Sequence, residues 1–307
     1  MAAITLNEYA KGLNDPVQRA VVELWAQSSD VLAAMPWKTT GGPYQYTLEG
    51  SLPGIAFRGI NESYTADTSI ENPQVEQLFI AGGEADVDNF LLAMDPSRRA
   101  REESRKIKSM ARAVTSAIIS GDNSANPKSF DGLSRRVRGA QVLSNSGTSG
   151  GAPLSLKALE DAIENTVEPT HIVMNRSMRG WFRAAMRDQT LSGNLNLSKD
   201  EFGREVLNYA GIPFLVGYEV GPDAKILPFT ETPSGGGTAQ TSSLYVASLK
   251  EGHVCGIQLA GMSVKDLGEL QSEPKHRTRI EWFPGMCIEN PYAVTRLTSF
   301  TNAAITA

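Results

Sequence analysis

Cysteine and histidine are scarce in this chain of 307 residues. It has two cysteines, Cys255 and Cys287, and three widely spaced histidines with no cysteine or carboxylate at metal-ligand spacing. Two thiols cannot staple a chain of this size, so folding in a reducing cytosol is expected. We also expect no metal site and no cofactor, because a structural zinc ion requires four clustered ligands.

Long apolar runs are absent as well. No stretch approaches the roughly 20 apolar residues that cross a membrane, and residues 1–8 lack the basic start and apolar segment of a signal peptide. With 41% hydrophobic and 21% charged residues, the composition is that of a globular protein. The net charge of −5 argues against a protein that binds nucleic acid over its whole surface. A soluble cytoplasmic product without membrane contact is expected.

Motifs for catalysis are missing, with one exception. No G-x-x-x-x-G-K-[ST] loop and no G-x-G-x-x-G after a strand occurs. Residues 147–151 (GTSGG) fit the G-x-S-x-G pattern of serine hydrolases, with Ser149 as the nucleophile. That pattern needs a strand before it and a helix directly after it, whereas here it lies in a Ser/Gly-rich linker. We therefore expect no enzyme, and a cytosolic serine hydrolase that uses Ser149 stays as an alternative.

Residues 1–38 predict a helical arm. Asp15-Pro16 is a favourable helix start, and apolar residues then recur at helical spacing until Pro36 ends the pattern. These apolar residues are Val17, Val21, Leu24, Trp25 and Leu32. Two interpretations stay open: the helix packs on its own domain, or it reaches over a neighbouring subunit.

Residues 39–80 predict an extended β-hairpin. Apolar and polar residues alternate over 44–48, Leu52-Pro53-Gly54 supplies a turn, and a second extended piece runs to Ile60. Residues 61–73 are polar and show no periodicity. A two-stranded hairpin is marginally stable by itself, so we expect this segment to be mobile in a monomer and ordered by a partner. Packing within the chain is the alternative.

A long basic helix is predicted next. Asp95 is a natural N-cap, Pro96 is at the first helical position and Gly121 ends the helix, so the span 96–120 would be roughly 37 Å long. Its apolar stripe consists of Ile107, Met110, Ala111, Val114 and Ile118. Arginine and lysine crowd its first two-thirds, which is typical of a solvated face with ion pairs between turns. Contact with nucleic acid or with acidic neighbours is the alternative.

Helices and strands alternate after the flexible linker at 144–151, which predicts an α/β domain. A first helix is expected over 156–167. The expected strands are 170–174, 211–216, 226–229 and 244–249. The tail, with strands expected around 280–283 and 292–297, does not continue this alternation, so it is expected to return to the first domain.

The order of these elements resembles the major capsid proteins of tailed bacteriophages, the family with the Hong Kong 97 fold. Each pattern that carries the resemblance is short, and together they cover nearly the whole chain. The patterns are Leu52–Glu62, Gly82–Asp88, Ile118–Asp122 with Phe130–Leu133, Pro169–Asn175 with Trp181-Phe182, and Ile280–Gly285 with Tyr292–Leu297.

The resemblance implies an α+β fold of named parts. These are an N-terminal arm (1–38), an extended β-hairpin loop (39–80), a peripheral domain (81–152 and 280–307) with a spine helix (95–120), and an α/β axial domain (153–279). It implies hexamers and pentamers that close into an icosahedral phage head around double-stranded DNA, which is enclosed without sequence-specific binding. A portal, location in the virion and assembly in the host bacterial cytoplasm are implied with it.

Under this resemblance, the hairpin and the start of the spine helix are expected to join subunits. The expected contact residues are Tyr44, Tyr46, Leu48, Ile55, Phe57, Arg58, Arg98, Arg101 and Arg105.

Two departures from the family pattern narrow these expectations. No lysine lies between Thr39 and Lys106, so the Lys–Asn isopeptide cross-link of some relatives is not expected. Some relatives carry a long scaffolding region before the arm. The sequence before the arm is too short for such a region, which implies a separate scaffolding protein or none. An encapsulin-type nanocompartment shell shares the fold and is the nearest alternative. A tail or head-decoration protein would be shorter and richer in β structure.

Overall fold

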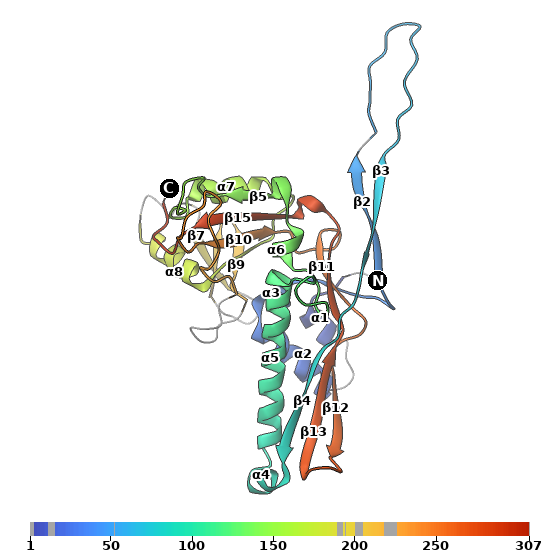
Figure 1. Cartoon of the computed structure of the whole chain (residues 1–307), viewed down its shortest axis with the longest axis vertical. Helices are drawn as coiled ribbons and strands as arrows, with labels where there is room; N and C mark the ends of the chain where they lie inside the picture. The colour runs from blue at the N-terminus through green and yellow to red at the C-terminus, as the bar shows by residue number, and fades with distance from the viewer. Residues whose placement is uncertain are drawn as a thin grey trace.

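A computed structural model of the chain describes residues 3–11, 16–51, 53–188, 193, 195–199, 205–217 and 226–306. Figure 1 shows three parts, which we call the body, the limb and the hairpin. The body holds the largest sheet, the limb pairs one long helix with a narrow sheet, and the hairpin extends far beyond both. No described helix is long and apolar enough to cross a membrane.

The N-terminal helices pack on their own chain. The elements are α1 (Leu6–Lys11), α2 (Pro16–Ser28), α3 (Asp30–Ala34) and β1 (Trp37–Thr39). Trp25, Trp37 and Trp282 are buried together, with ring centroids 4.1 Å apart for Trp25 and Trp282 and 4.5 Å apart for Trp37 and Trp282. Of the two interpretations left open, the described part of the arm therefore follows the first. Asp15 and the side chain of Val17 lie outside the described residues.

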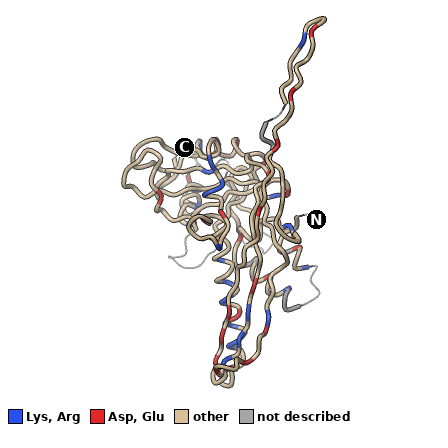
Figure 2. The backbone as a smooth tube through the Cα atoms, turned by 45° about the vertical axis from the view of Figure 1, so that its right-hand side comes forward, with Lys and Arg blue, Asp and Glu red and all other residues tan. Residues whose placement is uncertain are grey.

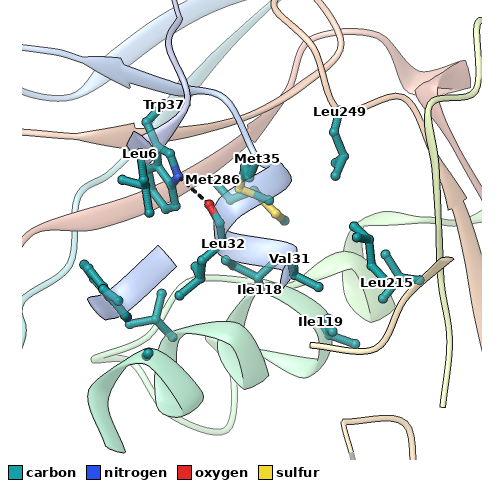
Figure 3. Packing of buried hydrophobic residues seen from close by; sticks show 14 of the residues in the cluster. Leu6, Val31, Leu32, Met35, Trp37, Ile118, Ile119, Leu215, Leu249 and Met286 are labelled. Atoms are coloured by element: carbon teal, nitrogen blue, oxygen red, sulfur yellow. Dashed lines mark hydrogen bonds between the residues drawn. The ribbon is translucent and has the colours of Figure 1, made fainter. Parts of the chain in front are cut away.

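The main core forms where α3 meets the end of α5 (Arg98–Ser120). Leu32 and Met35 share a buried cluster with residues 118–119 of α5, as Figure 3 shows. The indole N–H of Trp37 donates to the carbonyl oxygen of Leu32 at 3.4 Å. Each fully buried side chain of this size contributes roughly 1.5–3 kcal/mol, so this junction is a principal attachment of the N-terminal helices.

The long helix α5 begins later than the sequence predicts. Its N-cap is Ser97, whereas Asp95 ends α4 (Asn89–Met94) and accepts a hydrogen bond from the Ser97 backbone N–H at 3.1 Å. Asp95 precedes Pro96, and a residue before proline is disfavoured in the helical region, so its backbone is extended (φ −147°, ψ 94°). The end at Gly121 is confirmed. The predicted stripe is also confirmed, because Ile107, Met110, Ala111, Val114 and Ile118 are all buried.

Two glycines explain the chain path after α5. A Cβ atom at Gly121 would clash with the carbonyl oxygens of Ala117 and Phe130, and one at Gly132 would clash with the helix end itself. The Gly132 backbone N–H donates to the Gly121 carbonyl at 2.9 Å. The spacing Gly121 … Gly132 is therefore required by a close backbone approach. The short helices α6 (Leu133–Arg136) and η1 (Gly139–Gln141) follow.

The limb consists of α5 and a three-stranded antiparallel sheet in the order β12-β13-β4. The strands are β4 (Ala81–Asp88), β12 (Ser263–Glu269) and β13 (Lys275–Trp282). Ion pairs cross from β13 to β4, with Arg277 2.7 Å from Asp86 and Arg279 2.6 Å from Glu84. Figure 2 shows charges of both signs along this limb. The domain boundary expected between 279 and 280 falls inside β13.

The body is a seven-stranded mixed sheet in the order β5-β15-β10-β6-β9-β8-β7. The strands are β5 (Val142–Ser144), β6 (His171–Val173), β7 (Leu195–Lys199), β8 (Glu205–Tyr209), β9 (Ile212–Leu215), β10 (Ser242–Ala247) and β15 (Val294–Phe300). Ile172 and Val246 face the cluster of α7 (Leu156–Glu164) and α8 (Arg176–Ala185), whereas Val173 and Tyr245 face the α5 cluster. Alternation along each strand thus joins the two cores.

One expectation about the second half is wrong, because residues 226–229 form no strand. The tail that was expected to return to the first domain has two locations. Residues 275–282 pair with β4 of that domain, whereas β15 lies in the body sheet between β5 of the first domain and β10 of the axial domain. Periodicity could not place it, since Val294, Leu297 and Phe300 are all buried and would fit the centre of either sheet. The 3-10 helix η2 (Pro291–Ala293) precedes it.

A third sheet connects arm and limb, in the order β1-β11-β14 with β11 (Val254–Gln258) and β14 (Pro284–Ile288). The hairpin leaves beside it. Its strands are β2 (Tyr44–Ser51) and β3 (Ile70–Glu76), so the turn predicted at 52–54 is wrong. Tyr44 pairs with Glu76 and Leu48 with Asn72, so the partner strand begins near the end of the stretch 61–73, which shows no periodicity, and continues beyond it. Leu52 lies outside the described residues.

Candidate assembly interface

The tip of the hairpin, residues 53–69, is exposed throughout. It carries three large apolar side chains with almost no contact to the rest of the chain: Ile55 is 93% exposed, Phe57 103% and Ile60 94%. Isolated surface apolar residues are ordinary, but several on one projecting loop mark an interaction site. The tip therefore offers an apolar surface that this chain does not cover.

Polar contacts within the tip give the loop a defined shape. The Gly54 backbone N–H donates to Asp67 at 2.7 Å, which joins the two sides of the loop. The Arg58 guanidinium donates to the Glu62 carbonyl oxygen at 3.1 Å and lies 5.2 Å from the ring centroid of Tyr64. The Arg58 guanidinium thus makes contacts within its own loop.

The base of the hairpin, by contrast, is bound to the body. We define it as Tyr44, Tyr46, Glu76 and the groups that contact them. The Arg136 guanidinium of α6 makes a bidentate ion pair with Glu76, with Nη2 2.7 Å from Oε2. The Tyr46 hydroxyl donates to the same carboxylate at 3.2 Å. Burial, followed by the nearby Glu76 charge, raises the pKa of Tyr46 above its usual range, so this hydroxyl remains a donor.

A second ion pair anchors the other edge of the base. Lys38 Nζ lies 2.6 Å from Glu289 Oε1, and the Tyr44 hydroxyl donates to the same oxygen at 2.7 Å. Burial alone would lower the pKa of Lys38, but its hydrogen bonds to Glu289 and Tyr44 outweigh burial and raise it. Burial would likewise raise the pKa of Glu289, yet the bonds from Lys38 and Tyr44 lower it. Both groups are therefore charged at neutral pH.

The two tyrosines stack and cover a small buried cluster. Their ring centroids lie 5.9 Å apart at 22°, and they pack against Cys255, Ile257 and Cys287. Leu48, further along β2, is half-buried. The residues predicted from β2 thus belong to the base, whereas Ile55, Phe57 and Arg58 belong to the tip.

The predicted arginines of α5 lie far from the hairpin, at the start of the helix (Figure 1). All three are exposed. Arg101 pairs with Asp95, and Arg105 pairs with Glu102 at 2.7 Å. For Arg98 the described residues offer no ion-pair partner. The run is therefore largely a solvated face with local ion pairs.

Sequence reasoning missed two other features of this end of the limb. Arg99 binds Asp266 of β12 at 2.8 Å and Glu103 at 2.9 Å, so it fastens the helix to the sheet. Phe90 and Met94 of α4 are 70% and 71% exposed. Their apolar character directly before a charged helix was the available signal for a second exposed apolar surface.

The Ser149 motif does not have the geometry of a hydrolase. The Ser149 hydroxyl donates to the Gly236 carbonyl oxygen at 3.3 Å, and the next helix, α7, begins only at Leu156. Among the described residues no histidine hydrogen-bonds to it. His171 lies in β6, where burial lowers its pKa to about 4.

The linker at 144–151 is bound to a second loop of the body. Ser144 and Ser234 hydroxyls lie 2.6 Å apart, and the Gly150 N–H donates to Gly236 at 3.0 Å. These bonds hold the serine-rich segment in place, and they leave Ser149 without the strand–helix elbow that would activate it.

One family model matches part of the chain. Residues 14–152 match the family described as Major capsid protein GP7. This region runs from the arm through the hairpin and α5 to the linker. No curated protein matches the chain.

Solved structures match over nearly the whole chain. An encapsulin in the holo-SrpI complex from Synechococcus elongatus is 16% identical with a TM-score of 0.64, covering 90% of this chain and 89% of that chain. A structure from Mycobacterium phage Adephagia is 12% identical with a TM-score of 0.62, covering 92% and 91%. The capsid of a native GTA particle is 14% identical with a TM-score of 0.59, covering 86% and 87%.

At these identities the similarity to solved structures establishes the fold, which phage capsids and encapsulin share. The partial match to a capsid protein family makes the encapsulin alternative the weaker fit. Arm, hairpin, long helix and body sheet together have the Hong Kong 97-type architecture. Residues 14–152 match the model of the Major capsid protein GP7 family, and the chain has the fold of the phage and GTA capsid structures; together these findings support a capsid shell-forming role.

Proposed function

We propose that copies of this chain assemble through hexamers and pentamers into a closed icosahedral phage head around double-stranded DNA. Each contact between copies can be weak, because closure makes successive contacts effectively intramolecular. A subunit with an uncovered apolar tip on an anchored hairpin suits this arrangement, since each copy can engage a neighbour without changing its own core.

The observation that carries the proposal is the exposure of Ile55, Phe57 and Ile60 at the end of the hairpin. Covering one such side chain in a contact between subunits is worth roughly 1.5–3 kcal/mol before the cost of association. Tyr44 and Tyr46 contribute by fixing the direction in which the hairpin leaves the body.

The net negative charge of the chain suits a shell that encloses DNA without binding it tightly. The net charge is −5, and strong phosphate binding would be salt-sensitive and would oppose DNA release. We infer that DNA is enclosed without sequence-specific contact, and that the exposed Arg98, Arg101 and Arg105 make ion pairs at subunit rims, which set register more than affinity.

The remaining parts of the proposal concern setting and partners. The chain has no catalytic role, is part of the virion, and assembles in the host bacterial cytoplasm with a portal and a separate scaffolding protein. The fold is built to present surfaces to further copies, and the Ser149 segment lacks the geometry of a catalytic nucleophile.

Electron microscopy and sedimentation of the purified chain test the proposal directly. We expect closed shells or rings of subunits from the unmodified chain. The double variant Ile55→Ser, Phe57→Ser should remain monomeric with an unchanged unfolding midpoint, because neither side chain packs on its own body. A matched variant on the same loop, Ser63→Ala with Thr65→Ala, should still assemble.

Normal shells from the double variant would refute the role of the tip. DNA content separates the two shell types: particles purified from infected cells should hold double-stranded DNA protected from nuclease. Shells of one size that hold protein cargo and no DNA, without a portal vertex, would instead assign the chain to the encapsulin type.

A further inference from the structure

The two cysteines of the chain face each other beneath the hairpin base. Cys255 on β11 is directly opposite Cys287 on β14 in the antiparallel ladder, and their sulfur atoms lie 2.9 Å apart. Both are free and fully buried. They are 32 positions apart in the sequence, so no local sequence pattern predicts that they are paired.

We propose that Cys255 and Cys287 are a site of reversible disulfide formation that staples β11 to β14 under the hairpin base. Directly opposed residues of an antiparallel pair have Cα atoms about 4.5–5.5 Å apart. Disulfides span Cα separations of about 4.4–6.8 Å, so the bond needs only side-chain rotation and no shift of the strands.

A metal site is the competing use of these groups, because the ligand atoms of Cys255, Cys287 and Glu289 lie within 4.8 Å of one another. Two features argue against it. Glu289 Oε1 already accepts hydrogen bonds from Lys38 at 2.6 Å and Tyr44 at 2.7 Å. Thiolates at about 2.3 Å from a tetrahedral zinc ion would stand nearly 4 Å apart, and the observed 2.9 Å is well below that.

The oxidant we infer is a small-molecule disulfide such as oxidised glutathione. One cysteine thiolate attacks a glutathione sulfur, a mixed disulfide forms, and the first glutathione leaves. The second cysteine thiolate then attacks the protein-side sulfur, the Cys255–Cys287 bond forms, and the second glutathione leaves. The cysteines together lose two electrons, and the two departing glutathione thiols carry the two protons.

The surroundings control when this exchange occurs. Tyr44 and Tyr46 pack over the cysteine cluster, so an oxidant reaches the sulfurs only when the hairpin base opens. The hydrogen bond between the Cys287 thiol and the Cys255 sulfur, together with burial, raises the pKa of the Cys287 thiol, which keeps it protonated in the closed state. Only the timing rests on the proposed function: the bond would form after the particle leaves the reducing cytoplasm.

Refolding in glutathione buffers tests the site directly, because both cysteines are accessible to the oxidant while the chain is unfolded. The chain is refolded from urea at graded ratios of oxidised to reduced glutathione, then digested without reduction and analysed by mass spectrometry. We expect a peptide linked through Cys255 and Cys287, an intact mass lower by about 2 Da, and an unfolding midpoint roughly 5–10 °C higher than that of the reduced chain.

Cys255→Ser and Cys287→Ser are the matched controls, and neither should show the midpoint shift. Two thiols that persist at the highest oxidant ratio, glutathione retained on either cysteine, or bonds between chains would overturn the proposal. So would a stoichiometric zinc complex of the reduced chain, measured by metal analysis after dialysis and lost in both variants.

Discussion

The two ends of the hairpin are built differently although the same two strands form both. At the base, Tyr46 and Arg136 both donate to Glu76, and Tyr44 donates to Glu289. At the tip, all of residues 53–69 are exposed and no bond reaches the body among the described contacts. One ribbon is thus stabilised by its own chain at one end and left uncovered at the other.

This difference separates folding from assembly. Segments with few buried contacts contribute little to global stability and open at low free-energy cost, whereas partly buried ion pairs and stacked rings do contribute. Changes at the tip should therefore alter assembly alone, and changes at the base should alter the free energy of unfolding. The comparison also corrects the expectation that the whole hairpin is ordered only by a partner.

The largest effect should come from shortening the tip. Replacing residues 54–68 by Asn-Gly, a favourable two-residue hairpin turn, removes Ile55, Phe57 and Ile60 and keeps both strands of the base. We expect assembly to be abolished, while the unfolding midpoint changes by no more than about 2 °C. Sedimentation and thermal unfolding measure the two quantities on one sample.

Removing residues 44–60 is the matched comparison. That cut also takes away Tyr44 and Tyr46 and leaves β3 without its paired strand, so it should lower the unfolding midpoint as well as prevent assembly. If the two deletions destabilised the monomer equally, the distinction between base and tip would be wrong.

A smaller effect is expected at the ion pair between Arg136 and Glu76. Both side chains are 17% exposed, so Arg136→Met leaves a mostly buried carboxylate without its cation. Removing one partner of a buried pair costs about 3–5 kcal/mol, and partial exposure reduces this to roughly 2–3 kcal/mol. Urea unfolding measures the loss.

Arg98→Met serves as the control for a surface arginine. Arg98 is exposed at the start of α5, and surface substitutions usually change stability by less than about 0.5 kcal/mol. Equal losses from the two variants would mean that the base contact does not stabilise the chain.

Some features of the fold could be predicted because local chemistry specifies them. The end of α5 at Gly121 and its buried stripe follow from the need for a glycine at a close approach and from helical spacing. The position of Asp95 was misjudged because the effect of Pro96 on the preceding residue outweighed the preference of aspartate for an N-cap.

Other features depend on register between distant strands, and no local signal carries them. β3 (IENPQVE) contains Pro73 and is exposed on both faces, so it needs no alternation of apolar and polar residues. Arg136 lies 60 positions from Glu76. The base of the candidate interface was therefore predicted only in part, through Tyr44 and Tyr46. At the tip, Ile55 and Phe57 were expected as contacts through the family resemblance, whereas Ile60 was not among the expected residues.

The smallest expected effect is a pH dependence at Glu289, which would sharpen the account of the base. Its folded pKa is lowered by Lys38 and Tyr44 from an ordinary value of 4.5, so its stabilising contribution is complete above that value and is lost as the pH falls through the folded pKa. The free energy of unfolding should therefore fall less on acidification in Glu289→Gln than in the unmodified chain, by about 1 kcal/mol for a pair of this kind. Glu71→Gln, an exposed carboxylate on β3, should leave the profile unchanged. Identical profiles for all three proteins would show that the bonds of Glu289 to Lys38 and Tyr44 do not stabilise the hairpin base.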